Sequence, residues 1–129
     1  MERLKLNLLI CLACLISAET SWAKQDCNHL NEIAKKDGPL YLSKKPTYQV
    51  IGNKGFRTYF YSAPSNACKI KSLFLIPKDN VYAYQEFKNG NETWIYVMYQ
   101  DKNDTYPSGW MKKSDFRING YFATNLSSE

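Results

Sequence analysis

Few side chains in this 129-residue chain have the chemistry for catalysis. His29 is the only histidine, and no second histidine or free cysteine accompanies it to complete a zinc site or a Cys-His hydrolase. The segment Ser21-Trp22-Ala23-Lys24 matches a Ser-x-x-Lys motif by chance, since it straddles an expected cleavage point. A carboxylate pair for glycoside cleavage is the remaining catalytic alternative, but most acidic residues fall in expected turns. We therefore expect no enzyme, no cofactor and no metal site.

Aromatic side chains are the more informative group. The chain has ten tyrosines, more than a small barrel buries. Tyrosine and tryptophan suit binding surfaces because they offer a large contact area, few rotors to freeze and a polar tip. The alternative is that they pack at the rim of the fold with their hydroxyls in water. The candidate binding residues are Tyr59, Tyr61, Tyr82, Tyr84, Tyr96 and Trp110.

The first residues have the three-part layout of a secretory signal. Two basic residues, Arg3 and Lys5, precede an apolar run from Leu6 to Ile16, and small residues then lead to Ala23. The run is shorter than the roughly 20 residues of a spanning helix. We expect cleavage after Ala23; the alternatives are cleavage after Ala18, an uncleaved anchor and a buried helix.

Two of the four cysteines, Cys11 and Cys14, lie within this signal segment. The other two, Cys27 and Cys68, are an even number in a chain expected in an oxidising compartment, which predicts one disulfide. Closing a loop of about forty residues would stabilise the fold by about 4 kcal/mol through chain entropy. Two free buried thiols are the alternative.

The net charge of +5 makes the protein basic. Its lysines occur singly or in pairs, with no arginine cluster of the kind that binds phosphate, and this spacing is typical of solvated faces. An acidic partner, either an anionic envelope polymer or an acidic protein, is the alternative. A nucleic-acid-binding barrel would suit the composition but conflicts with export.

The elements that must position these residues are mostly strands. One helix is expected from Asp26, as its cap, to Gly38, as its stop. Short segments rich in β-branched and aromatic residues then alternate with turn signals, which indicates a barrel or sandwich. The expected strands cover residues 40–42, 48–51, 57–61, 73–76, 81–87, 93–99 and 109–112.

Alternation along two of these strands predicts which side chains face the core. The small or aliphatic residues Val81, Ala83, Ile95 and Val97 suit a tight interior. The intervening tyrosines, including Tyr82, Tyr84 and Tyr96, would then face outward. A single bulge would reverse this parity.

Four blocks in order carry a family resemblance. They are Tyr59-Phe60-Tyr61-Ser62-Ala63-Pro64-Ser65, Phe74-Leu75-Ile76-Pro77-Lys78-Asp79-Asn80-Val81, Trp94-Ile95-Tyr96-Val97-Met98-Tyr99 and Gly109-Trp110-Met111-Lys112-Lys113-Ser114-Asp115-Phe116. Together they resemble the bacterial Src homology 3 family over about residues 57–118. The chain departs from the family at Lys78, where glycine is usual, so we expect a type I turn there.

The resemblance implies a mainly β fold, a small Src-homology-3-like β-barrel with one short N-terminal α-helix. The expected organisation is a signal peptide (1–23), a helix and strand extension (24–56), the barrel (57–118) and a C-terminal tail (119–129). The extension would either cover or extend the barrel.

Members of this family mostly bind peptides, cell-wall stem peptides or proteins. We therefore expect a periplasmic or secreted, non-catalytic binding protein of inhibitor or immunity type that blocks a toxin or cell-wall hydrolase. Wall-binding barrels usually accompany a catalytic or anchoring domain, and segments such as Phe74-Leu75-Ile76-Pro77 resemble small exported proteins found beside contact-dependent toxin systems. The alternative is a module for peptidoglycan stem peptides or another extended peptide. Neither a nucleic-acid partner nor a membrane span in the mature chain is expected.

Overall fold

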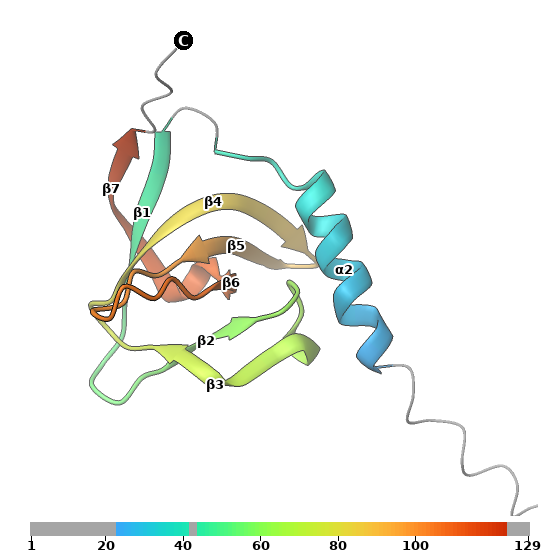
Figure 1. Ribbon diagram of the computed structural model, residues 1–129, viewed down its shortest axis with the longest axis horizontal. Helices are drawn as coiled ribbons and strands as arrows, with labels where there is room; N and C mark the ends of the chain where they lie inside the picture. Colours follow the sequence, from blue (N-terminus) through green and yellow to red (C-terminus); the bar gives the residue numbers. More distant parts are fainter. Residues whose placement is uncertain (1–22, 42–43, 124–129) are drawn as a thin grey trace, which may run out of the picture.

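The computed structural model describes residues 23–41 and 44–123 of the chain (Figure 1). These residues form a mainly β structure with one α-helix, as the sequence predicts. The expected signal segment up to Trp22 lies outside the described residues. The elements are helix α2 (Ala23–Asp37), strands β1 (Lys44–Val50), β2 (Thr58–Tyr61), β3 (Lys69–Leu75), β4 (Asn80–Asn89), β5 (Glu92–Met98), β6 (Ser108–Lys112) and β7 (Phe116–Ala123), and the 3-10 turns η2 (Asn66–Cys68) and η3 (Lys113–Asp115).

Helix α2 ends where the sequence predicts and begins earlier. The Gly38 amide donates to the Ala34 carbonyl at 2.9 Å, and a Cβ on Gly38 would lie only 2.4 Å from the Glu86 carbonyl oxygen, so only glycine fits there. Asp26 lies in the first turn and is not the cap, because the helix formers before it extend the helix to Ala23. A carboxylate in the first turn still favours the helix dipole. No helix in the described part of the chain is long and apolar enough to span a membrane.

All seven strands pair antiparallel in one sheet of order β3-β2-β6-β5-β4-β1-β7. The sheet does not close into a barrel, because within residues 44–123 the terminal strands β3 and β7 have no hydrogen-bonded pairing with each other. Strand β1, from the expected extension, adds to the sheet beside β4. The expected extension, residues 24–56, therefore both extends and covers the sheet. Its strand β1 adds to the sheet, and its helix α2 packs against one face (Figure 1).

Strand β7 extends to Ala123, into the segment 119–129 expected as a C-terminal tail, although Asn119-Gly120 is by itself a typical turn sequence. In the structure the pair forms part of a bulge: Thr47 pairs with Gly120 and Tyr48 with Ile118, which leaves Asn119 as the extra residue. Conversely, the expected strand over residues 40–42 is reduced to one isolated bridge between Leu40 and Gln85, and residue 42 lies outside the described residues.

The sheet curls around a core to which every strand contributes. The predicted inward residues of β4 and β5 are confirmed there: Val81, Ala83, Ile95 and Val97 are all buried. The other buried members of this cluster are Tyr48, Val50, Phe60, Leu75, Met111 and Phe116. Because alternate residues point to opposite faces, the tyrosines between the core residues face outward.

The turn from Ile76 to Asp79 differs from expectation. The Asp79 amide donates to the Ile76 carbonyl at 3.1 Å, and Lys78 has φ = 77°. Proline at the second position and positive φ at the third define a type II turn, so the predicted type I geometry is wrong. Pro77 fixes the turn, and Lys78 takes the left-handed conformation that glycine adopts more easily.

Candidate functional site: the outer face of the sheet and its polar groove

The centre of the outer face is covered by helix α2. Trp94 and Trp110 are almost fully buried, and their cluster includes Tyr61 of β2 and Ala34 of α2. The rings of Tyr61 and Trp94 lie 4.8 Å apart in an edge-to-face arrangement. The indole Nε1 of Trp110 donates to Asn31 Oδ1 on the helix at 2.8 Å. A second hydrophobic cluster therefore joins the helix to the sheet.

Two further contacts fix the helix. The buried side-chain amide of Gln85 donates to the carbonyls of Ala34, Lys35 and Gly38 at 2.8–2.9 Å, which satisfies orphan acceptors at the helix C-terminus. The predicted disulfide is confirmed: Cys27 in the helix is bonded to Cys68 in η2. Nothing in the sequence marked Gln85, because a glutamine between two polar or aromatic neighbours gives no sign of burial.

Two of the predicted binding residues are buried in the second hydrophobic cluster. Trp110 is 0% exposed and Tyr61 is 4% exposed, so the expectation that they line an exposed groove is wrong. The neighbouring Tyr96 is only partly buried, and its ring packs 5.4 Å from Trp110 with Lys35 Nζ 4.8 Å above it. These three residues lie under or beside α2.

Tyr82 and Tyr84 lie on the part of the outer face that α2 leaves uncovered. Their rings pack edge-to-face on Phe122 of β7, with centroids 4.7 and 6.4 Å away, and Lys45 Nζ lies 4.4 Å above the Tyr84 ring. All four side chains are partly exposed. We call Lys45, Tyr82, Tyr84 and Phe122 the Tyr–Phe cluster. Phe122 was missed because its strand was not predicted.

The remaining predicted residue, Tyr59, lies at the other flank of the outer face. It packs against Phe74 of β3 with ring centroids 5.8 Å apart. Lys69 Nζ lies 4.7 Å above the Tyr59 ring, and the Arg57 guanidinium lies 4.3 Å above Phe74. The six predicted residues therefore share one face but belong to three sets, of which the central one includes the buried Tyr61 and Trp110.

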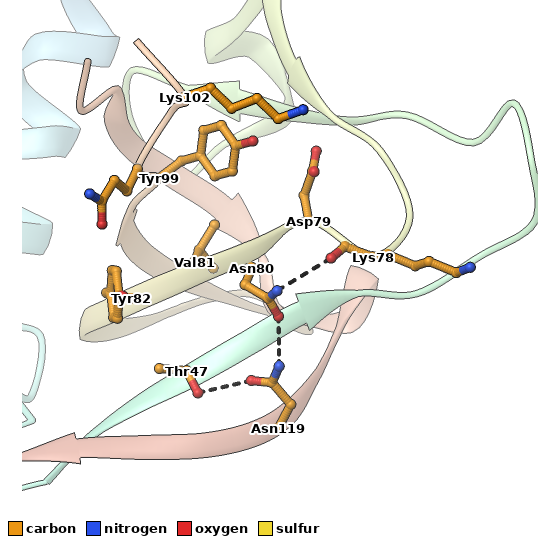
Figure 2. A pocket seen from close by; sticks show the side chains of 10 residues that line it. Thr47, Lys78, Asp79, Asn80, Val81, Tyr82, Tyr99, Lys102 and Asn119 are labelled. Carbon is orange, nitrogen blue, oxygen red and sulfur yellow. Dashed lines mark hydrogen bonds between the residues drawn. The ribbon is translucent and has the colours of Figure 1, made fainter. Parts of the chain in front are cut away.

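A polar groove adjoins the Tyr–Phe cluster and shares Tyr82 with it (Figure 2). Its volume is about 530 Å³. One wall carries a chain of hydrogen bonds: Thr47 Oγ1 donates to Asn119 Oδ1 at 2.8 Å, Asn119 Nδ2 to Asn80 Oδ1 at 2.6 Å, and Asn80 Nδ2 to the Lys78 carbonyl at 3.4 Å. Each amide keeps unused hydrogen-bonding capacity, which suits it to peptide groups.

Tyr99 and Lys102 form the opposite wall, and Asp79 lies at the end (Figure 2). Burial raises the pKa of Tyr99 above its ordinary value, and the carboxylates of Asp79 and Asp101 raise it further. The phenol therefore stays protonated at neutral pH. Asp101 orders the loop by accepting hydrogen bonds from the Lys102 amide and the Thr105 hydroxyl.

The residues that line the groove offer aromatic, hydrogen-bonding and charged contacts for binding. His29 is exposed on α2 and is not among the residues that line the groove. Within residues 23–41 and 44–123 no three histidine, cysteine, aspartate or glutamate side chains gather closely enough to hold a metal ion.

Comparison of the chain with protein-family models, curated proteins and solved structures finds no match. The resemblance to the bacterial Src homology 3 family therefore rests on the four sequence blocks alone.

Proposed function

We propose that this chain is an exported, non-catalytic binding protein that blocks a partner protein, as an inhibitor or immunity-type protein does. The observation that carries the proposal is the Tyr–Phe cluster, which is an uncovered group of aromatic side chains beside a groove. Central aromatic anchors with polar tips are the residues that dominate protein interfaces.

The cluster is also held in place before any partner arrives. Tyr82 lies opposite Thr47 on β1 and Met98 on β5, so its strand is paired on both sides. The β1 strand pairs in turn with β7, which carries Phe122. Side chains fixed on paired strands lose less conformational entropy on binding than side chains on free loops, which favours tight association.

Export is supported by the signal-like pattern of residues 1–23, and non-catalytic binding by the resemblance to a family of mostly peptide- and protein-binding barrels. The first test expresses the full coding sequence with a C-terminal tag in a bacterial host. Mass spectrometry of the periplasmic or secreted product would give its N-terminus, expected at Lys24. Recovery of the full-length chain from the cytoplasm alone would contradict export.

The second test is a pull-down with the purified, oxidised protein from periplasmic extract. We expect stoichiometric capture of one protein, whose isolated activity then falls when the two are mixed at equal concentration. A captured protein whose toxic or hydrolytic activity does not change would contradict the blocking role.

The Tyr–Phe cluster makes a mutational prediction. Tyr82→Ala should weaken binding of the captured partner by about 2 kcal/mol or more, because a central aromatic anchor is lost. Isothermal titration calorimetry would measure the change. Tyr106→Ala is the matched control, since Tyr106 is exposed on the loop between β5 and β6 and belongs to neither the cluster nor the groove. Unchanged thermal unfolding of both variants would separate binding from folding, and equal losses of affinity would contradict the assignment.

The alternative function is recognition of peptidoglycan stem peptides or another extended peptide. The side-chain amides of Asn80 and Asn119, linked to the Thr47 hydroxyl along one wall of the groove, favour it, because side-chain amides pair well with peptide groups. Sedimentation with insoluble peptidoglycan, run beside the pull-down at two salt concentrations, separates the two functions. Co-sedimentation without capture of a protein would favour the wall.

A further inference from the structure

The edge of the sheet at β3 is a second surface, separate from the Tyr–Phe cluster. Among the described strands, β3 is the last in the sheet order and pairs only with β2, at Leu75, Phe74 and Lys69. Its other edge meets no strand among the described residues. A free strand edge presents unpaired backbone amides and carbonyls on which another extended chain can pair.

This edge is exposed and basic. Four of its seven residues are exposed, among them Lys69, Lys71 and Phe74, and Ile76 directly after it is also exposed. Arg57 and Lys69 add positive charge above the rings of Phe74 and Tyr59. The surface therefore combines a free backbone, aromatic contacts and clustered cations.

These cations have no carboxylate partner in the described part of the chain, where the one ion pair joins Lys113 to Glu86. Two carboxylates beside β3 and its neighbour β2 are engaged in the fold. Asp79 accepts from the Ile76 amide at 2.9 Å, and Asp115 accepts from the Thr58 hydroxyl at 2.8 Å. The positive charge at this edge is therefore available to an incoming anion.

Lysines on an edge strand usually serve to prevent pairing with other chains. The same charges repel a second copy of β3 while attracting a strand of opposite charge, since opposite charges across a strand pair stabilise it and like charges destabilise it. The positive charge of β3 therefore favours pairing with an acidic strand and disfavours pairing with a second copy of β3.

The surface continues into a hollow at the start of the strand. This space of about 560 Å³ lies between α2 and β3 and is lined by Cys27, Asn28, Lys69 and Ile70 among others. A chain paired along β3 would run into it at the end nearest η2. The disulfide between Cys27 and Cys68 keeps both sides of the hollow together.

We infer that the open edge of β3 binds an extended, acidic segment of a partner protein by adding it to the sheet as an eighth strand. The inference is independent of the Tyr–Phe cluster and does not require that the partner be blocked.

The test uses a probe peptide, an acetylated and amidated nonapeptide in which glutamate alternates with valine and threonine. Binding to the oxidised, ¹⁵N-labelled protein is followed by NMR and by amide hydrogen exchange. We expect slower exchange for amides of residues 69–75 and no change for β7 at the other edge. The same peptide with alternate amides N-methylated should not bind, because it cannot pair along the edge.

Charge exchange gives the sharper test. Lys69→Glu with Lys71→Glu should weaken binding of the acidic peptide about tenfold and create binding of the corresponding lysine peptide. Lys54→Glu with Lys88→Glu is the control, since both lysines are exposed and lie outside β3, and should leave the acidic peptide's affinity within about twofold. The Tyr82→Ala variant should bind the acidic peptide with the same affinity as the wild type. A loss of peptide binding at β3 can therefore be distinguished from a loss of partner binding at the Tyr–Phe cluster.

Three outcomes would overturn the inference. The first is equal weakening by the control pair, which would indicate general electrostatic attraction. The second is binding of the N-methylated peptide with unchanged affinity. The third is tight binding of inorganic polyphosphate with no binding of the acidic peptide, which would indicate a site for anionic polymers.

Discussion

Single buried polar groups position the outer face of this protein. Trp110 and Asn31 lie far apart in the sequence, and one hydrogen bond between them ties the indole to α2. The side-chain amide of Gln85 ties the C-terminus of the helix to the sheet through hydrogen bonds to three backbone carbonyls. A buried donor left without an acceptor costs more than an ordinary hydrogen bond contributes, so each of these residues has a measurable effect on stability.

Asn31→Ala should lower the free energy of unfolding by about 1 to 3 kcal/mol, because the Trp110 indole N–H would lose its acceptor in a buried site. Urea denaturation followed by tryptophan fluorescence measures the change. Asn28→Ala on the exposed side of the same helix is the control and should change stability by less than about 0.5 kcal/mol. Equal effects would contradict the role of the hydrogen bond.

Lys78→Gly should raise the free energy of unfolding by about 0.5 to 1 kcal/mol, since Lys78 adopts positive φ in a type II turn and glycine does so without steric cost. Lys78→Ala, which removes the side chain but keeps the steric cost, should leave stability nearly unchanged. Thermal unfolding of both variants provides the measurement. A stabilising alanine variant would show that the charge, and not the backbone, is responsible.

At the scale of elements, the stability of helix α2 depends on its contacts with the sheet. Its apolar cluster with Trp94 and Trp110, the Gln85 amide and the disulfide all hold it over the outer face. Isolated helices of this length are marginal in water, so the packed position supplies most of the helix stability.

Cys27→Ser combined with Cys68→Ser should lower the free energy of unfolding by about 4 kcal/mol, because the cross-link closes a long loop in the unfolded chain. Chemical denaturation with and without a reducing agent measures this change in the free energy of unfolding. The reducing agent should destabilise the wild type by a similar amount and leave the double variant unchanged. A wild type that is insensitive to reduction would contradict the prediction.

At the scale of the whole molecule, the group of Tyr41, Glu86 and Lys113 joins the segment after α2, strand β4 and η3. The Tyr41 hydroxyl and the Lys113 ammonium both donate to the Glu86 carboxylate. Burial by itself raises the pKa of Glu86, but the hydrogen bonds from Lys113 and Tyr41 and the positive charges of Lys113 and Lys88 together outweigh it and bring the pKa below the ordinary value of 4.5. The ionised carboxylate therefore stabilises the folded state.

Because the folded-state pKa of Glu86 is lowered, its contribution is fully present above the unfolded-state pKa and is lost as the pH falls through the folded-state value. The stability difference between the wild type and Glu86→Gln should be constant near neutral pH and shrink below pH 4.5. Urea denaturation from pH 3 to pH 7 checks this. Glu92→Gln, whose carboxylate accepts an exposed hydrogen bond from the Ser114 hydroxyl, is the control. A difference that grows at low pH would contradict the assignment.

The sequence alone determined the features that depend on local chemistry. The cysteine count predicted the disulfide, alternation predicted that Val81, Ala83, Ile95 and Val97 face the core, and Gly38 predicted the end of the helix. Each of these follows from a residue and its near neighbours along the chain, through periodicity or through a steric need for glycine.

Only the tertiary structure decided which aromatic residues are accessible. Tyr61 and Trp110 follow the same outward parity as Tyr82 and Tyr84, but α2 packs over the first pair and leaves the second uncovered. The open sheet and strand β7 also depended on long-range pairing, since Asn119-Gly120 favours a turn locally and becomes a bulge only because β1 pairs beside it. Contacts between distant segments outweigh local preference at these positions, and no pattern of neighbouring residues records them.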